Sequence, residues 1–206
     1  MWKYFSLSNL FFKYLLICVA FLLTFSLNAF NYSEIKTFSK NGFLQMVVEI
    51  PAGTNKKIEY DYNLNDFFID KLDGEDRVIN FLPYPGNYGF IPSTRMDKER
   101  GGDGDALDIL LISESINTGI VVEVIPIAIL VLQDSNEIDT KIIAIPVKKN
   151  LRIINVKNYS DLSTDYSIIK DVIKLWFVNY KGNDVVKFIK WGDETDAKVE
   201  IKKWVL

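Results

Sequence analysis

The sequence predicts a mainly β (α+β) protein, a closed or nearly closed β-barrel with two or more flanking α-helices. Two observations predict this fold. From Phe43 onward, short runs rich in β-branched and aromatic residues are separated by Gly, Asn and Pro, as in barrels of short strands. Near the C-terminus the apolar residues recur with a helical period instead. At 206 residues, 49% of them hydrophobic, the chain suits one domain with a sizeable core plus a leader.

Residues 1–29 are predicted to be a targeting segment. Two lysines precede the apolar run Tyr14–Leu27, whose length of about fourteen residues is short of the roughly twenty that a spanning helix needs. Ala29 offers a cleavage position, so a cleaved signal peptide is preferred to an uncleaved membrane anchor, and a buried N-terminal helix comes third. Either of the first two would place residues 30–206 outside the cytoplasm, in the periplasm or anchored to the membrane. A cytoplasmic location is the alternative.

The composition restricts the chemistry of the domain. Histidine is absent, and the only cysteine, Cys18, lies in the leader. Disulfides, thiol catalysis and histidine triads are therefore excluded, and acid–base chemistry must use carboxylates, lysine, tyrosine or metal-bound water. Beyond the first thirty residues the net charge is −5, which argues against nucleic acid as a partner.

Six runs are predicted to be strands. They are Leu44–Pro51, Lys57–Tyr62, Asp66–Asp70, Leu107–Ile112, Ile120–Leu132 and Lys141–Val147. Pro126 lies inside the longest run and indicates an edge, a bend or a bulge, because proline cannot donate to the ladder of hydrogen bonds.

Two helices are predicted after these strands. In the first, Tyr166–Tyr180, one face holds Ile169, Val172, Ile173, Trp176 and Tyr180, and Gly182 marks its end. A second, shorter amphipathic helix is outlined by Ala197, Ile201, Trp204 and Val205.

The most informative stretch holds Asp103, Asp105 and Asp108 around Gly104 and leads directly into an apolar strand. Carboxylates this close repel one another unless a cation lies among them. Hard divalent ions such as Mg²⁺ favour oxygen ligands, so the stretch predicts a metal site on a loop at the edge of the β structure. A calcium loop of the EF-hand type is the rival. It fits poorly, because Leu107 occupies a ligand position and Asp108 replaces the required glycine.

Other charged residues are placed where they would join this site. Asp134 and Asp139 flank the connection between two predicted strands, although either one taken alone is better explained as a solvated loop acid. Further acids from earlier strands are Glu49 and Glu59. Four cations lie near strand or helix ends: Lys57, Arg77, Lys141 and Lys181. Metal-binding acids mixed with cations are what a multiply charged phosphate substrate needs.

Several segments resemble the family I soluble inorganic pyrophosphatases. DGDALDI, Asp103–Ile109, is similar to the family signature. Further blocks match in order: Val47–Tyr60, Phe81–Pro92, Asp139–Pro146 and Asn179–Gly182. The family's fold is a five-stranded OB-like closed barrel with helices alongside, which the resemblance implies for residues 30–206. It also implies Mg²⁺-dependent hydrolysis of inorganic pyrophosphate, with Mn²⁺ or Zn²⁺ as substitutes.

The resemblance implies a role for each matching residue. Direct ligands of activating metal ions would be Asp103, Asp108 and Asp139, with Asp134 binding a metal that arrives with substrate. Acids that reach metals through water would be Glu49 and Glu59. Asp105 resembles the general base. The groups that hold pyrophosphate and phosphate would be Lys57, Arg77, Tyr88, Tyr180 and Lys181, supported by Lys141. Lys71 competes with Arg77 for its place, because the spacing there varies within the family.

Two departures from the family pattern stand out. Ala106 lies where the signature usually has proline, and Met96–Gly102 resembles an insertion that would form a lid or a longer turn. Neither removes a side chain implied to be essential. Relatives of this family are oligomers, so a homo-oligomer is expected, with pyrophosphate as the small-molecule partner and the membrane touched only through an uncleaved leader. The alternative function is an exported barrel that binds metal or phosphate without turnover.

Overall fold

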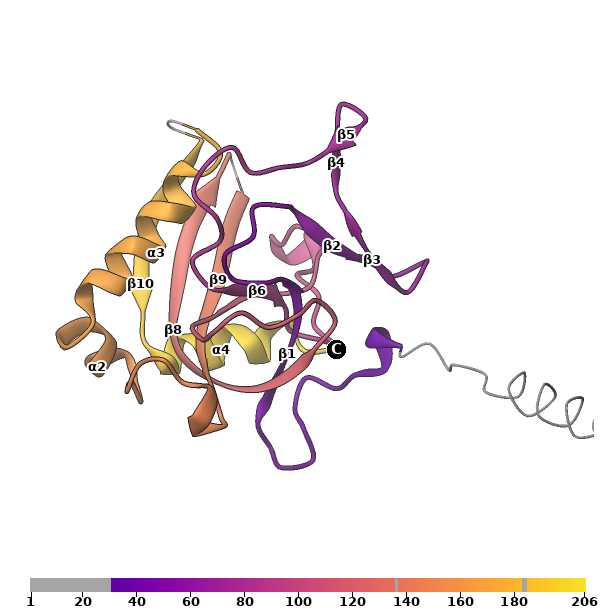
Figure 1. Ribbon diagram of the computed structural model, residues 1–206. Coiled ribbons are helices and arrows are strands. Elements are labelled where there is room, and N and C mark those ends of the chain that lie inside the picture. Colours follow the sequence, from indigo (N-terminus) through magenta and orange to yellow (C-terminus); the bar gives the residue numbers. More distant parts are fainter. Residues whose placement is uncertain (1–30, 136, 183–184) are drawn as a thin grey trace, which may run out of the picture. The chain divides into compact units, whose positions relative to one another are not determined.

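A computed structural model describes residues 31–135, 137–182 and 185–206 (Figure 1). The predicted targeting segment, with Cys18, lies outside the described residues.

Five strands form a closed ring, which confirms the predicted barrel. They are β1 (Leu44–Ile50), β6 (Asn87–Phe90), β7 (Asp108–Leu111), β8 (Val121–Asp134) and β9 (Glu137–Pro146). The order is β1-β6-β7-β9-β8, and β8 pairs with β1 to close the ring. All neighbours are antiparallel except β7 and β9, which are parallel. The register of β8 against β9 shifts between Pro126 and Ala128, so the bulge expected at the proline is present.

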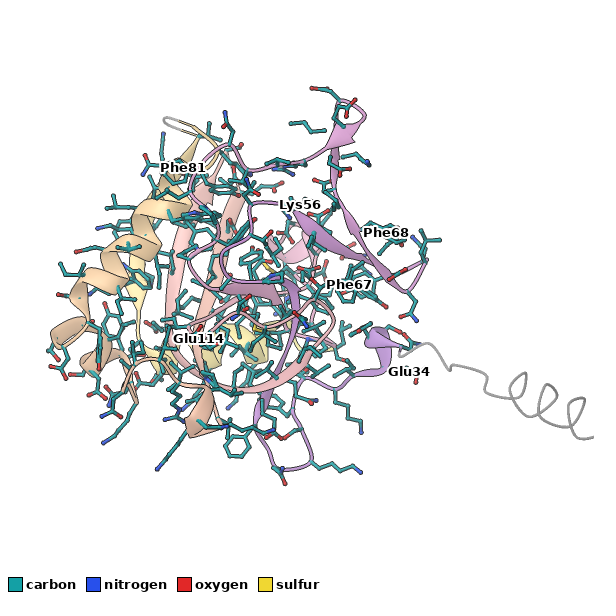
Figure 2. All side chains as sticks on the ribbon, in the orientation of Figure 1. Glu34, Lys56, Phe67, Phe68, Phe81 and Glu114 are labelled. Atoms are coloured by element: carbon teal, nitrogen blue, oxygen red, sulfur yellow. The ribbon has the colours of Figure 1, made fainter. Side chains whose placement is uncertain are left out.

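The remaining strands lie outside the ring. Strand β10 (Val186–Gly192) was not predicted from the sequence. It pairs with β8 from outside the ring and is the last strand in the sheet order. Strands β2 (Ile58–Asp61) and β3 (Asp66–Ile69) pair only with each other, as do β4 (Lys71–Leu72) and β5 (Glu75–Asp76). In the first hairpin, Phe67 packs against Tyr60, whereas Phe68 is 46% exposed (Figure 2). Two predicted strands therefore form a hairpin beside the barrel.

Helices α2 (Tyr159–Thr164) and α3 (Ser167–Asn179) lie on the side of the ring that carries β10 (Figure 1). Helix α4 (Glu194–Trp204) packs against β8, and its first turn is capped by Asp193, whose side chain accepts from the backbone of Thr195. Both predicted helices are thus present. Short 3-10 turns are Tyr32–Glu34 (η1), Lys98–Arg100 (η2) and Lys149–Leu151 (η3).

Two details of the helix predictions are wrong. Val172 is 50% exposed, and Phe177 is buried in its place, because the buried stripe of α3 is centred on Ile173, Trp176 and Phe177. Val205 lies beyond the end of α4, in extended backbone.

The core has two large parts and a small third one made of Val47, Tyr60 and Phe90. One lies between the ring and the helices α2 and α3, and includes Leu130, Ile143, Leu162 and Phe177. The other is lined by ring residues such as Met46 and Ile142 and is covered by α4. In residues 31–206, setting aside 136, 183 and 184, no helix is long and apolar enough to span a membrane.

Candidate active site

One cavity of about 550 Å³ collects every side chain that the sequence singled out for the site except Lys71, the competitor of Arg77. The predicted acids that line it are Glu49, Glu59, Asp103, Asp105, Asp108, Asp134 and Asp139, and Glu137 at the start of β9 lines it although it was not predicted. The remaining candidates that line it are Lys57, Arg77, Tyr88, Lys141, Tyr180 and Lys181. They come from β1, β2, β6, β7, β8, β9, the end of α3 and the loops between them. Residues far apart in the sequence are therefore gathered at one end of the ring.

Strand pairing brings the first group together. Asp108 begins β7 and pairs in register with Lys141 on the parallel strand β9. Asp139 lies two residues before Lys141, so both side chains point to the same face of β9. The carboxylates of Asp108 and Asp139 both form ion pairs with the Lys141 ammonium, the second at 2.6 Å. We call these three residues the strand corner.

Within the strand corner Lys141 is almost closed to water, at 5% exposed, whereas the carboxylates of Asp108 and Asp139 are partly exposed. Burial alone would lower the pKa of Lys141, but Asp108 and Asp139 outweigh it and raise the pKa. Burial raises the pKa of Asp139 in spite of the lysine. One ammonium therefore does not neutralise two carboxylates, and the corner keeps an excess of negative charge.

The Asp103 and Asp105 side chains lie on a turn before β7, which we call the loop corner. Asp103 Oδ1 accepts a hydrogen bond of 2.9 Å from the backbone N–H of Asp105. No ion pair within 4.0 Å involves either carboxylate among the residues that the structure describes. Burial raises the pKa of Asp105, and the charges of Asp103 and Asp108 raise it further.

Glu49 lies on the wall that β1 contributes. Its Oε1 accepts a hydrogen bond of 2.8 Å from the backbone N–H of Tyr60. Burial raises the pKa of Glu49 to about 8, even though this hydrogen bond and Lys57 act in the opposite direction. The carboxyl is thus largely protonated at neutral pH unless a cation approaches it.

Two further lysines pair with acids of the cavity. Lys181, directly after α3, contacts Asp134 at the end of β8, and Lys57 contacts Glu59 on β2. Tyr180 is stacked on Trp176 with ring centroids 4.8 Å apart. The two residues that follow α3, a tyrosine and a lysine, therefore both line the cavity.

Residues 46–206 match the family model described as inorganic pyrophosphatase. This chain belongs to the inorganic pyrophosphatase family. It is 37% identical over 169 residues to the inorganic pyrophosphatase of Aquifex pyrophilus, covering 79% of this chain and 87% of that protein. It is 33% identical to that of Campylobacter jejuni, covering 84% and 94%. Among solved structures, the Thermus thermophilus inorganic pyrophosphatase superposes with a TM-score of 0.71 at 30% identity, covering 84% of this chain and 95% of that one.

Within this pyrophosphatase family member, the structure distinguishes the two competing cations. Arg77 lines the cavity, and its Nη1 donates to Asp70 Oδ2 at 2.8 Å. Lys71 forms an exposed pair with Asp76 in the β4–β5 hairpin and does not line the cavity. The geometry therefore favours Arg77.

Some residues that line the cavity were not predicted for the site. Tyr62, after β2, and Tyr84 both line it; Tyr84 is buried, which raises its pKa, whereas Tyr62 is exposed. Tyr84 had a usable signal, because it precedes Tyr88 in the same segment rich in proline and glycine. Tyr62 had no such signal, because it lies at the end of a predicted strand and outside the blocks that match the family.

The donor set suits a divalent metal ion. Eight carboxyl groups line the cavity and offer oxygen ligands, and Glu49, Asp105 and Asp139 have raised pKa values that a nearby cation would reverse. Within the described part of the chain, no three acidic side chains are gathered closely enough to hold one ion, and Lys141 stands between Asp108 and Asp139. The oxygen ligands present therefore suit a divalent metal ion chemically, and the Lys141 ammonium lies between two of them, Asp108 and Asp139.

Proposed function

We propose that this protein is an inorganic diphosphatase, which hydrolyses pyrophosphate to two phosphates with a divalent metal. The observation that carries the proposal is the convergence on one cavity of all thirteen acidic, basic and tyrosine side chains to which the resemblance assigned a role. A cavity rich only in acids would suit a bare cation. The cations interleaved with these acids suit a metal bound together with a polyanion.

In this proposal Mg²⁺ is the natural metal, with Mn²⁺ or Zn²⁺ as substitutes. The direct ligands would be Asp103, Asp108 and Asp139, joined by Asp134 when substrate binds, while Glu49 and Glu59 would act through water. When bound, the metal ions would offset the charge of pyrophosphate and make nearby water more acidic.

The chemical step then assigns Asp105 as the general base. Its carboxylate accepts a proton from the attacking water, whose oxygen bonds to one phosphorus while the bond from that phosphorus to the bridging oxygen breaks. The second phosphate leaves with the bridging oxygen. The raised pKa of Asp105 brings it nearer to the operating pH, which suits a proton acceptor.

The cations and tyrosines of the cavity hold the substrate. Lys57, Arg77 and Lys181 would bind phosphate oxygens, with Lys141 in support. Tyr88 and Tyr180 both line the cavity, so their hydroxyls would donate hydrogen bonds to phosphate oxygens. Burial keeps the pKa of Tyr88 well above its usual value, so its hydroxyl stays protonated and able to donate. Charge on the transferring and leaving phosphates would be stabilised by this set.

The test is phosphate release from pyrophosphate by the full chain, with and without Mg²⁺. We expect rapid release that depends on Mg²⁺. Absence of release with Mg²⁺, Mn²⁺ or Zn²⁺, from protein shown to be folded by circular dichroism, would contradict the proposal. It would favour the alternative of a barrel that binds metal or phosphate without turnover.

A homo-oligomer is also part of the proposal. Helix α3 and strand β10, which contact each other, both carry exposed apolar side chains: Ile168, Val172 and Leu175 on α3, and Phe188 and Ile189 on β10. Such a patch on a soluble domain supports an interface with another copy. Light scattering after gel filtration measures the number of copies, and a monomer at micromolar concentration would contradict the expectation.

Export from the cytoplasm remains a proposal that rests on residues 1–29 alone. Fractionation of cells that express the full chain, followed by N-terminal sequencing of the mature protein, tests both export and cleavage. Recovery of the uncleaved chain from the soluble cytoplasmic fraction would contradict it.

A further inference from the structure

The segment Met96–Gly102 is fixed against the loop corner. The backbone N–H of Met96 donates to the Asp105 carbonyl at 2.7 Å, and the N–H of Gly104 donates to the Met96 carbonyl at 2.7 Å. The Met96 side chain is 4% exposed, so it anchors the segment in the core. The segment is therefore an integral part of the turn that carries the two aspartates.

Lys98 lies in the η2 turn of this segment, and its side chain crosses Gly104. A Cβ atom on residue 104 would come within 2.6 Å of Lys98 Cε and 3.5 Å of its Nζ. Gly104 also has a φ of +98°, which side chains with a Cβ rarely adopt. Glycine is thus required by the backbone conformation, and the stem of Lys98 lies over the space that its missing side chain leaves.

Some acids of the cavity form ion pairs with lysines, and within the described residues the two acids of the loop corner do not. Glu59, Asp134 and the pair Asp108 and Asp139 each form an ion pair with a lysine of the site. The loop corner has no such partner within 4.0 Å in the part of the chain that the structure describes.

The Lys98 ammonium is close enough to act on this corner. Its Nζ lies 3.5 Å from the position that a Cβ of Gly104 would take, and Gly104 stands between the two aspartates of the turn. Lys98 is itself exposed, so water and salt partly screen the attraction between its ammonium and the two carboxylates.

We propose that Lys98 is a positioning residue of the active site, whose stem braces the Asp103–Asp105 turn across Gly104 and whose ammonium group offsets the charge of the two aspartates. The inference rests on the proposed function, because these aspartates are assigned there to the metal and the proton transfer. The charge weakens cation binding at the loop corner, and the stem keeps Asp105 in place for proton transfer. The two contributions are separable by substitution.

Three variants of Lys98 separate them. Lys98→Met keeps most of the stem and removes the charge, Lys98→Ala removes both, and Lys98→Arg keeps both. Lys202→Met is the matched control, because Lys202 is an exposed lysine of α4 away from the cavity lining, and its loss changes the net charge equally.

The first readout is calorimetric titration of the metal-free full chain with Mg²⁺ alone. We expect Lys98→Met and Lys98→Ala to bind Mg²⁺ about three- to tenfold more tightly than the unmodified protein, because a screened like charge is removed. Lys98→Arg and Lys202→Met should remain within about twofold. Equal affinities for Lys98→Met and Lys202→Met would overturn the electrostatic part of the proposal.

The second readout is the split between kcat and KM in pyrophosphate hydrolysis at saturating Mg²⁺. Lys98→Ala should lose kcat by about five- to tenfold with little change in KM, since misplacement of a general base affects the chemical step. Lys98→Met should keep kcat within about twofold, because its stem still covers Gly104. Identical kcat values for the two variants would overturn the bracing part. If the unmodified protein hydrolyses no pyrophosphate, the proposed function fails by itself, and the Mg²⁺ titration still decides the role of the Lys98 charge.

Discussion

The strand corner and the loop corner hold their acids in different ways. In the strand corner, Asp108 and Asp139 are fixed by the pairing of two parallel strands, and a buried lysine is bound between them. In the loop corner, Asp103 and Asp105 are fixed by turn hydrogen bonds and have no lysine in direct contact within the described residues. Both corners carry excess negative charge, yet only one of them has a built-in counter-ion.

The difference indicates a division of labour. Acids on paired strands cannot shift without breaking the ladder, which suits ligands and charges that must stay in place. An acid on a braced turn without an ion-pair partner keeps its basicity, which suits proton transfer. The predictions below test whether the two corners differ in this way.

The largest effect is expected from Asp105→Asn, which removes the proton acceptor and keeps the size of the side chain. Turnover should fall by about 10²–10⁴-fold, the usual scale for loss of a general base. The far-ultraviolet circular dichroism spectrum should be unchanged and the urea midpoint should not fall, because the Asp105 carboxylate has no ion-pair partner in the described structure and burial raises its pKa. Turnover within fivefold of the unmodified enzyme, measured by phosphate release at saturating Mg²⁺, would refute the assignment.

The next effect should appear in the strand corner as stability. Lys141→Met leaves Asp108 and Asp139 close together without their shared ammonium, and loss of one partner from a buried pair is strongly destabilising. We expect about 2–4 kcal/mol in the free energy of unfolding of the metal-free protein, below the full range for buried pairs because both carboxylates are partly exposed. Urea denaturation measures this value.

Two comparisons sharpen that prediction. Lys57→Met should cost less, because its partner Glu59 is largely exposed. Saturating Mg²⁺ should reduce the cost of Lys141→Met, since a bound cation replaces the missing charge. If Lys141→Met and Lys57→Met are equally stable, the ion pairs of Lys141 contribute no more to stability than the Lys57–Glu59 pair, and the prediction is wrong.

A smaller, pH-dependent effect is expected at Glu49, whose pKa is raised to about 8 by burial. The folded state holds this proton where the unfolded state has lost it, so Glu49 makes folding less favourable as the pH rises from about 4.5 to 8. Glu49→Gln keeps an oxygen that accepts from Tyr60 and removes the titration. Relative to the unmodified protein, the variant should gain about 1–3 kcal/mol of stability between pH 5 and pH 8.5 without metal. A constant difference across this range would show that Glu49 does not titrate as described.

Much of the ring was predictable because its strands are apolar and bounded by turn residues. Strand β6 was missed since Gly89 in its centre indicated a turn. The glycine is needed in the strand itself, because a Cβ there would lie 2.0 Å from the Val47 carbonyl oxygen on β1. Strand β10 was missed because it is an outer strand with four exposed positions in a row. Close backbone approach and position at an edge are tertiary facts that a local pattern does not carry.

The site shows the same limit in another form. Each candidate was visible as a residue type in a motif, and the resemblance ordered those motifs along the chain. What the sequence did not contain was the pairing of β7 with β9, which brings Asp108 against Lys141. Nor did it show Lys98 over Gly104, since an insertion has no counterpart from which its position follows. Long-range pairing and packing create these contacts.

The smallest effect is expected where the sequence left two cations open. Lys71 forms an exposed pair with Asp76 outside the cavity, so Lys71→Ala should leave kcat and KM within about twofold, as for most exposed ion pairs. Arg77→Ala is the matched comparison from the same hairpin region, and it should raise KM for pyrophosphate by about tenfold through loss of a phosphate contact. Asp70→Asn adds a second test, because Asp70 holds the Arg77 guanidinium at 2.8 Å and should affect KM in the same direction to a lesser extent. If Lys71→Ala raises KM and Arg77→Ala does not, the hairpin closes over the substrate in solution and Lys71 takes the place assigned to Arg77.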